Sequence, residues 1–391
     1  MTNSNDSYLS RGVSPTKDEV KAAIADMDKG LFPNAFCQIS EDPAGDPDYC
    51  FALHADGAGT KSSLAYLMYK ETGDYRFFHG IAQDSLVMNT DDLACIGATG
   101  SFFLSNTIGR NAHRVDGEAI AEVIRGYRDL VEELNALGCS IQMTGGETAD
   151  VGDLVRTLIC DSTIAVRMKK EDVIDLANVR EGLVIVGLSR SGQATYEKQE
   201  NSGIASNGLT AARHLLLDHR YAALYPETYS DTLDPDKVYS GKHDVLEALE
   251  GTSLTYGEAI LSPTRTFLPL LNKILPAYKQ QIHGIVHCTG GGQVKCKDFG
   301  RGIHYVKNDL FELPAIFKSI YAGGEIGARE LYQVFNCGHL MELYVDEESA
   351  KGIIDLAASF NIEAKIVGYT KASADEKNHV TIQSALGEFH Y

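Results

Sequence analysis

The chain has 391 residues, 44% of them hydrophobic and 23% charged, and this length exceeds what one hydrophobic core usually holds, so two domains are expected. Its formal net charge of −19 at pH 7 argues against a nucleic-acid-binding surface, because binding to phosphates requires clustered Lys and Arg. The eight cysteines are scattered and include no C-x-x-C pair, so no structural zinc site is expected. The sequence shows no signal peptide and no apolar run long enough to cross a bilayer. We therefore expect a reduced, cytoplasmic protein without a membrane partner.

The first 170 residues alternate predicted strands with predicted helices. Thr16 and Glu19 form a capping-box pattern before a short helix that ends at Gly30. The clearest helix covers residues 116–137, where apolar residues recur every three or four positions, and residues 80–98 show a second helical face. Strands are predicted within residues 48–57, 101–109, 139–143 and 154–168.

The second half repeats this alternation after a charged connector at residues 169–182. Strands are predicted to begin at residues 183 and 282, each leading into a loop, and to cover 339–345 and 363–370. Helices are predicted at 206–219, 313–324, 327–335 and 347–361, and residues 218–255 are typical of a long surface excursion. The fold class is therefore α/β or α+β, with a domain at 1–170 and another at 171–391.

The segment HADGAGTK, residues 54–61, follows the first predicted strand. Gly57 and Gly59 allow backbone N–H groups to approach a phosphate, and Thr60 can donate a hydrogen bond to a phosphate oxygen. Asp56 is a candidate ligand for Mg²⁺, and Lys61 can neutralise negative charge. The glycine spacing matches neither a Walker A loop nor a dinucleotide fingerprint. Taken alone, the segment is also typical of a tight turn followed by a surface lysine.

Two more acidic segments lie near predicted element ends. Asp91 and Asp92 occur in NTDDL, residues 89–93, where helical geometry allows only one of them to face a given metal ion. Glu147 follows a diglycine in GGETAD, residues 145–150, at the end of a predicted strand, where α/β folds usually bind ligands. Each acid alone fits a solvated turn or helix terminus, but the three segments together favour a site for a Mg²⁺-bound nucleotide.

Glycine loops recur in the second half. SNG opens a predicted helix, for which Asn207 is a candidate N-cap, and TGGG follows a predicted strand. Their amides suit an anion, so the candidate ligand-binding residues are Asn207, Gly208, Thr289, Gly290, Gly291 and Gly292. His287 lies beside TGGG, and its imidazole suits proton transfer, although a lone histidine next to a strand is more often structural. An ordinary glycine turn and an N-cap explain these loops equally well.

Seven motifs in order resemble the phosphoribosylformylglycinamidine cyclo-ligase family, the aminoimidazole ribonucleotide synthetases. They are DGAGTK (56–61), NTDDLACIGA (89–98), GGETAD (145–150), SNG (206–208), SPTR (262–265), HCTGGG (287–292) and FNCG (335–338). The resemblance implies amino-terminal domains that pair into a dimeric β-barrel, and a carboxy-terminal α/β sandwich. It also implies a homodimer that uses ATP and Mg²⁺ to phosphorylate the formyl oxygen of formylglycinamidine ribonucleotide and close the ring of aminoimidazole ribonucleotide.

The resemblance also implies roles for individual residues. Asp56, Asp92 and Glu147 are expected to hold the metal, while the SNG and TGGG loops are expected to hold the ribose phosphate. The residues expected to act in catalysis are Asp56 and Lys61, together with His287 and His339, whose role is our own hypothesis and is not implied by the resemblance.

The chain departs from the family pattern at two positions. Ala205 stands where the family usually has the histidine of His-Ser-Asn-Gly, and His339 stands where an apolar residue is usual. Our hypothesis is that His339 or His287 supplies the imidazole that is absent at Ala205. Residues 192–201 and 218–255 also look like insertions relative to shorter family members.

Two other interpretations stay open. Thiamine-monophosphate kinase, the hydrogenase-maturation dehydratase and selenophosphate synthetase share this architecture, but the chain lacks the short motif or cysteine that each of them relies on. A non-catalytic, nucleotide-binding regulator is the second interpretation, with Ala205 as the mark of lost activity. Retention of Asp56, Lys61, Asp92 and Glu147 argues against it.

Overall fold

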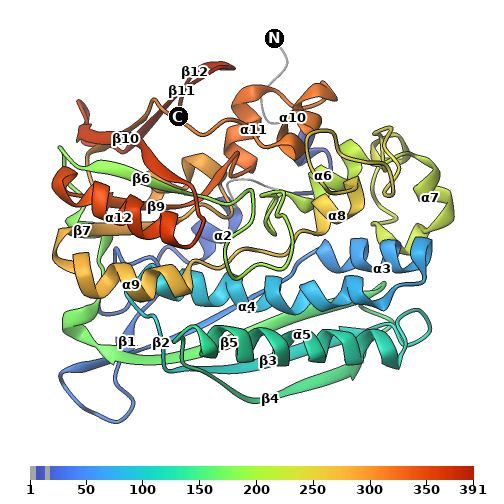
Figure 1. Cartoon of the computed structure of the whole chain (residues 1–391), viewed down its shortest axis with the longest axis horizontal. Coiled ribbons are helices and arrows are strands. Elements are labelled where there is room, and N and C mark those ends of the chain that lie inside the picture. The colour runs from blue at the N-terminus through green and yellow to red at the C-terminus, as the bar shows by residue number, and fades with distance from the viewer. Residues whose placement is uncertain (1–5, 14–17) are drawn as a thin grey trace.

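The computed structural model describes residues 6–13 and 18–391, which form two halves, each built around one β-sheet (Figure 1). The first sheet lies along the lower edge of the view and the second at its upper left, with helix α4 (His79–Ala94) running between them. The chain leaves the first sheet at Lys169 and enters the second at Val184. Thr16 of the predicted capping box lies outside the described residues, and the helix expected after it is α2 (Asp18–Ala23), which α1 (Asp6–Leu9) precedes.

The first sheet has five strands in the order β1-β2-β5-β3-β4. They are β1 (Ser40–Glu41), β2 (Tyr49–Gly57), β3 (Phe102–Arg110), β4 (Ile141–Asp150) and β5 (Leu158–Lys169). Neighbouring strands are antiparallel except β3 and β4, which are parallel and joined through a long helix. The helices that pack on this sheet are α3 (Lys61–Thr72), α4 and α5 (Gly117–Ala136).

The most periodic predicted helix is confirmed as α5. Asp116 is its N-cap, and the Asp116 side chain accepts a hydrogen bond from the backbone N–H of Ala119. The buried side chains Ile120, Val123 and Tyr127 follow the predicted spacing of three and four residues. The first predicted strand is likewise confirmed as β2, so the chain is a mixed α/β protein.

The first sheet has one buried face and one open face. Side chains along β5 alternate between buried and less buried positions, as expected when helices cover only one side. The other face carries Leu53, Phe103 and Ile159, whose exposed fractions are 61%, 46% and 40%. The barrel implied by the resemblance is not formed within the described part of one chain, because β1 and β4 lie at the two edges of an open sheet.

The second sheet has seven strands in the order β12-β11-β8-β10-β6-β9-β7. They are β6 (Val184–Ser189), β7 (Ile282–His287), β8 (Ile303–Lys307), β9 (His339–Val345), β10 (Ala364–Ala372), β11 (His379–Ser384) and β12 (Gly387–His390). The helices of this half are α6 (Leu209–Leu216), α7 (Arg220–Leu224), α8 (Tyr256–Leu261), α9 (Leu268–Tyr278), α10 (Ala315–Ala322), α11 (Ala328–Val334) and α12 (Glu347–Ser359). The central strands β6 and β9 are almost wholly buried, so this sheet forms the core of the second half.

Two local predictions differ from the structure. The diglycine before Glu147 lies inside strand β4 and not after it, because β4 continues to pair with β3 beyond an irregularity at Leu104 and Ser105. The N-cap of α6 is Gly208, with φ +76°, and not Asn207. Among the described residues, none of the helices combines the length and the apolar composition that a membrane-spanning segment needs.

Candidate active site

Helix α4 places a row of polar residues at the junction of the two halves. Asp84, Asn89, Asp91 and Asp92 are all buried, and Asp91 and Asp92 lie within the helix instead of at a solvated end. Burying carboxylates is costly unless they are hydrogen-bonded or paired with charges. The partners of three of these four residues come from the second half of the chain, so the junction itself is the polar site.

Asp84 is the centre of a buried network that links both halves. Its Oδ1 atom accepts hydrogen bonds from Lys61 Nζ (2.8 Å) and Ser206 Oγ (3.0 Å). The same oxygen accepts from the backbone N–H (2.8 Å) and the hydroxyl (2.6 Å) of Thr264. Lys61 also donates to the backbone oxygen of Ser262 at 2.6 Å. Lys61 is therefore a buried connector to the SPTR segment, where the sequence predicted an accessible lysine.

A second cation lies close to this network. Arg190, which follows β6, is fully buried and donates through Nη2 to the backbone oxygen of Pro263 at 3.2 Å. Its Nε and Nη1 atoms, and Oδ2 of Asp84, have no hydrogen-bond partner among the described residues. Burial lowers the pKa of Arg190 to about 9 and that of Lys61 to about 8. Two buried cations thus lie beside one carboxylate, and two of the Arg190 nitrogens have no acceptor among the described residues. This arrangement suits an anionic ligand.

Asp92 lies between two imidazoles. Its Oδ1 atom contacts His287 Nδ1 at 2.6 Å, and its Oδ2 atom lies 3.4 Å from His54 Nε2. His287 ends β7 and is fully buried, and its Nε2 atom has no partner among the described residues. Thr289, at the start of TGGG, is also buried and donates its backbone N–H to the oxygen of His287. The structure thus brings together two predicted residues, Asp92 and His287, 195 positions apart.

Asp91 holds the loop after SPTR. It accepts hydrogen bonds from the Thr266 hydroxyl at 2.6 Å and from the backbone N–H of Phe267 at 2.7 Å. Burial raises the pKa of Asp91 to about 6. Asp91 therefore faces the protein interior, and Asp92 is the acid of this pair that lies beside the histidines.

The DGAG turn lies at the end of β2. Asp56 is exposed, and its Oδ1 atom accepts a hydrogen bond from the backbone N–H of Gly57 at 2.7 Å. A Cβ atom added to Gly57 would lie 1.7 Å from Oδ1 of Asp161, so only glycine fits beside that carboxylate. Burial and then the charge of Asp56 raise the pKa of Asp161, a nearby acid that the sequence did not single out.

The rest of this turn contacts the second half. Gly59 has φ +57°, and open space surrounds the position that its Cβ would take. Thr60 is exposed, and its hydroxyl lies 3.1 Å from that of Thr210 in α6. The turn therefore faces the helix that follows SNG.

Glu147 does not join the other predicted metal ligands within one chain. Glu147 pairs with Thr107, Thr107 pairs with Asp161, and Asp161 pairs with Gly57, so three strand spacings, about 14 Å, separate Glu147 from β2. Asp56 precedes Gly57, so its side chain leaves the opposite face of the sheet. The sequence could not show this, because the diglycine resembled a turn.

The two glycine loops lie side by side. A Cβ atom on Gly290 would lie 3.7 Å from Nδ2 of Asn207, and Oδ1 of Asn207 has no partner among the described residues. Gly208, Gly291 and Gly292 have φ values of +76°, +98° and +52°, which side chains rarely adopt. SNG and TGGG thus form one surface next to His287.

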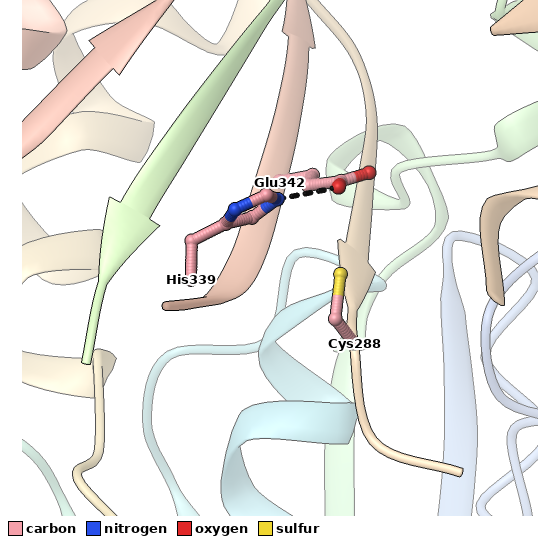
Figure 2. Close-up of side chains that lie close together, drawn as sticks. All are labelled: Cys288, His339 and Glu342. Atoms are coloured by element: carbon pink, nitrogen blue, oxygen red, sulfur yellow. Dashed lines mark hydrogen bonds and ion pairs between the residues drawn. The ribbon is translucent and has the colours of Figure 1, made fainter. Parts of the chain in front are cut away.

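His339 lies in a different cluster, in the core of the second half. Figure 2 shows Cys288 beneath the pair formed by His339 and Glu342. The His339 Nε2 atom lies 2.7 Å from Oε1 of Glu342, and burial lowers the pKa of His339. The Lys307 ammonium group contacts the same oxygen. Burial opposes ionisation of Glu342, but Lys307 and His339 outweigh it and lower its pKa to about 2.

This core cluster has the side chains of a metal site, since its three potential ligand atoms lie within 4.8 Å of one another. Lys307, however, already supplies a cation to the carboxylate of Glu342. The arrangement is therefore that of a neutralised buried ion pair, and the structure does not bring His339 to Asp84 or Asp92.

Comparison with known proteins agrees with the fold and the motifs. Residues 35–166 match the family AIRS, described as AIR synthase related protein, N-terminal domain. The phosphoribosylformylglycinamidine cyclo-ligase of Methanocaldococcus jannaschii is 28% identical over 345 residues, covering 88% of this chain and 84% of the relative.

Two solved structures share the fold. A chain of the HypE–HypF complex is similar with a TM-score of 0.55 at 13% identity, covering 95% of this chain and 97% of that one. Thermotoga maritima PurL complexed with ADP is similar with a TM-score of 0.53 at 11% identity, covering 98% of this chain and 50% of that longer one. The chain is therefore similar to the phosphoribosylformylglycinamidine cyclo-ligases over most of its length, and its residues 35–166 match the AIR synthase related N-terminal domain.

Proposed function

We propose that the chain catalyses the ATP-dependent closure of formylglycinamidine ribonucleotide to aminoimidazole ribonucleotide. The γ-phosphoryl group of ATP passes to the formyl oxygen, an amidine nitrogen bonds to the formyl carbon, and phosphate leaves with that oxygen. ADP, phosphate and one proton are released. The observation that carries the proposal is the meeting of the His287–Asp92 pair with the SNG and TGGG loops at one interdomain site, in a relative of the cyclo-ligases.

His287 is proposed to accept the proton lost on ring closure. Asp92 accepts from Nδ1 of His287, which leaves Nε2 as the basic atom, and that atom has no partner among the described residues. A carboxylate that holds one ring nitrogen fixes the tautomer and the ring orientation, as in catalytic triads. Ala205 therefore needs no replacement by His339, which we propose acts in the fold.

The glycine loops and Arg190 are proposed to bind the ribose phosphate. The backbone of the TGGG loop is left-handed at Gly291 and Gly292, a geometry that presents loop amides to anions, while the Gly292 N–H itself donates to the backbone oxygen of Thr289. Arg190 contributes a buried charge with two unused nitrogens, Nε and Nη1. An anion placed there would balance the second cation beside Asp84.

The nucleotide is proposed to bind at the DGAG turn, with Gly57, Gly59 and Thr60 at the phosphates. Asp56 and Asp92 are the pair of acids that fits a divalent ion, because Asp56 shares a face of β2 with His54, which contacts Asp92. Bound Mg²⁺ would neutralise phosphate charge at this place. Glu147 could approach such a site only from a second copy of the chain.

A homodimer is proposed on the open face of the first sheet. Leu53, Phe103 and Ile159 form an apolar surface there, and exposed apolar surfaces of this kind mark interfaces. Two such faces packed together would close the five-stranded sheets around a shared core, which the resemblance describes as a barrel.

The test is the formation of ADP and aminoimidazole ribonucleotide from ATP, Mg²⁺ and formylglycinamidine ribonucleotide. We expect both products in equal amounts, and no ADP release with thiamine monophosphate or selenide as acceptors. His287→Gln should abolish both products, whereas His283→Gln, a histidine at the other end of β7, should retain them. Nucleotide binding without ADP release for any acceptor would support a regulator instead and would refute the proposal.

A further inference from the structure

The FNCG motif, residues 335–338, has no role in the proposed function, yet both glycine loops rest on it. A Cβ atom added to Gly292 would lie 2.4 Å from the backbone oxygen of Phe335, and one added to Gly208 would lie 2.4 Å from Cε1 of the same residue. Phe335 is itself buried. The TGGG and SNG loops thus pack against one residue, so the position of FNCG sets the spacing between them.

Asn336 attaches FNCG to the segment that leads into SNG. Its Nδ2 atom donates to the backbone oxygen of Gly203 at 3.0 Å, and its Oδ1 atom accepts from the backbone N–H of Gly338 at 3.1 Å. These hydrogen bonds involve no residue of TGGG. The hydrogen bonds that hold TGGG to FNCG come from a different residue.

Gln293, the residue after TGGG, supplies these hydrogen bonds. Its side chain is fully buried, and Nε2 donates to the backbone oxygen of Asn336 and to that of His339, the latter at 3.0 Å. One amide group thus holds carbonyl oxygens before and after the turn at Cys337 and Gly338. The end of TGGG is thereby tied to the segment on which both loops rest.

The core of the second half fixes the orientation of the Gln293 amide. Lys307 Nζ donates to the backbone oxygen of Gln293 at 2.5 Å and lies 3.3 Å from its Oε1 atom. A flipped amide would turn its oxygen toward two carbonyl oxygens and its nitrogen toward an ammonium group, so only the observed orientation pairs each donor with an acceptor. Lys307 is held in turn by Glu342, and all three side chains are fully buried. A polar link therefore runs from the sheet to the glycine loops.

We propose that Gln293 is a positioning residue that holds TGGG against FNCG and so fixes the spacing of the two glycine loops. A bound phosphate needs donors from both loops at set positions, and a supporting contact behind such donors keeps them there. Gln293 does not touch the ligand. The inference rests on the proposed function only where it concerns substrate binding, because the hold on the loops is a property of the protein alone.

The test uses two substitutions that separate the two sides of the amide. Gln293→Met keeps the length of the side chain but removes its side-chain hydrogen bonds, whereas Gln293→Glu keeps an acceptor for Lys307 and loses the amide hydrogens that hold FNCG. Both variants should release the loop. An effect in Gln293→Met alone would confine the residue to pairing with Lys307 and would overturn the inference. The control is Tyr344→Phe, which removes a hydrogen bond of 2.6 Å to the same Glu342 carboxylate without touching either loop.

The first readout is amide hydrogen exchange, followed by mass spectrometry, in peptides that cover residues 287–294 and 335–340. Loss of one hydrogen bond should speed local opening about 10-fold. We expect faster exchange in both peptides for both Gln293 variants and unchanged exchange for Tyr344→Phe. Unfolding of both Gln293 variants would overturn the inference, because the residue would then serve the fold as a whole.

The second readout is binding of the ribose phosphate. We expect both Gln293 variants to raise KM for formylglycinamidine ribonucleotide and Kd for ribose 5-phosphate about 10-fold, with kcat little changed, since the phosphate is remote from the formyl carbon. Tyr344→Phe should change neither. Unchanged exchange, or unchanged KM in an enzyme that closes the ring, would overturn the inference. If wild-type protein closes no ring and binds no ribose 5-phosphate, the proposed function fails, while hydrogen exchange still decides whether Gln293 holds the loops.

Discussion

Replacing Asp84 by Asn tests whether the two halves are held together by a buried ionic network. The carboxylate of Asp84 accepts from Lys61 Nζ at 2.8 Å, and both side chains are fully buried. Asparagine keeps the shape but removes the charge, so Lys61 would lose its paired carboxylate and Arg190 would lose the strongest of the negative charges that act on it. Removing one partner of a buried ion pair costs about 3–5 kcal/mol, and we expect a loss of that size in the free energy of unfolding.

A double variant shows whether this loss comes from the pair. Lys61→Met combined with Asp84→Leu removes both charges, and apolar replacements of buried pairs are often close to neutral. The double variant should therefore be more stable than the sum of the two single changes by about 1–3 kcal/mol.

Urea denaturation followed by far-ultraviolet circular dichroism measures these differences, because the chain has no tryptophan for fluorescence. The control is Asp355→Asn, whose partner Lys351 is 84% exposed, and this change should cost less than about 1 kcal/mol. A loss below about 1 kcal/mol in Asp84→Asn, or strictly additive effects in the double variant, would refute the role assigned to the network.

Four further outcomes are expected. Burial lowers the pKa of Lys61 to about 8, so between pH 8 and 10.5 the folded chain binds fewer protons than the unfolded chain. The free energy of unfolding of wild type should therefore rise relative to that of Lys61→Met as the pH increases through this window, as measured by urea titrations. Asp56→Asn should abolish ADP release but leave the melting temperature almost unchanged, because Asp56 is exposed; retained activity would remove its metal role. His339→Ala should lower the free energy of unfolding by about 2–4 kcal/mol while kcat per folded molecule persists, and a kcat loss without destabilisation would place His339 in the chemistry. Phe103→Glu should convert a dimer to a monomer in light scattering, and an unchanged mass would contradict pairing through the open sheet face.

Sequence patterns predicted the elements whose signal is local. The helix at 116–137 combines an N-cap acid with apolar residues at helical spacing, and α5 follows it closely. His287 was also predicted at the end of a strand beside the glycine loop, where it lies. These features depend on residues that are close together in the chain.

The sequence did not predict features that depend on contacts between residues far apart in the chain. Asp84 and Arg190 have no motif of their own, and their importance comes from residues that lie elsewhere in the chain. Glu147 was placed at a strand end because a diglycine resembles a turn, whereas pairing with β3 keeps it extended. His339 was predicted to act in catalysis because it departs from the family pattern, whereas in the structure it pairs with Glu342 in the core.

The donors that surround Asp84 also limit how this chain can be divided. Three of the four hydrogen bonds to its Oδ1 atom come from Ser206 and Thr264, beyond the crossover near residue 170, and one comes from Lys61. A fragment that stops at the crossover would leave a charged pair facing water without those donors. Chimeras between relatives should therefore exchange the SNG and SPTR segments together with α3 and α4, because swapping either half alone would pair mismatched surfaces.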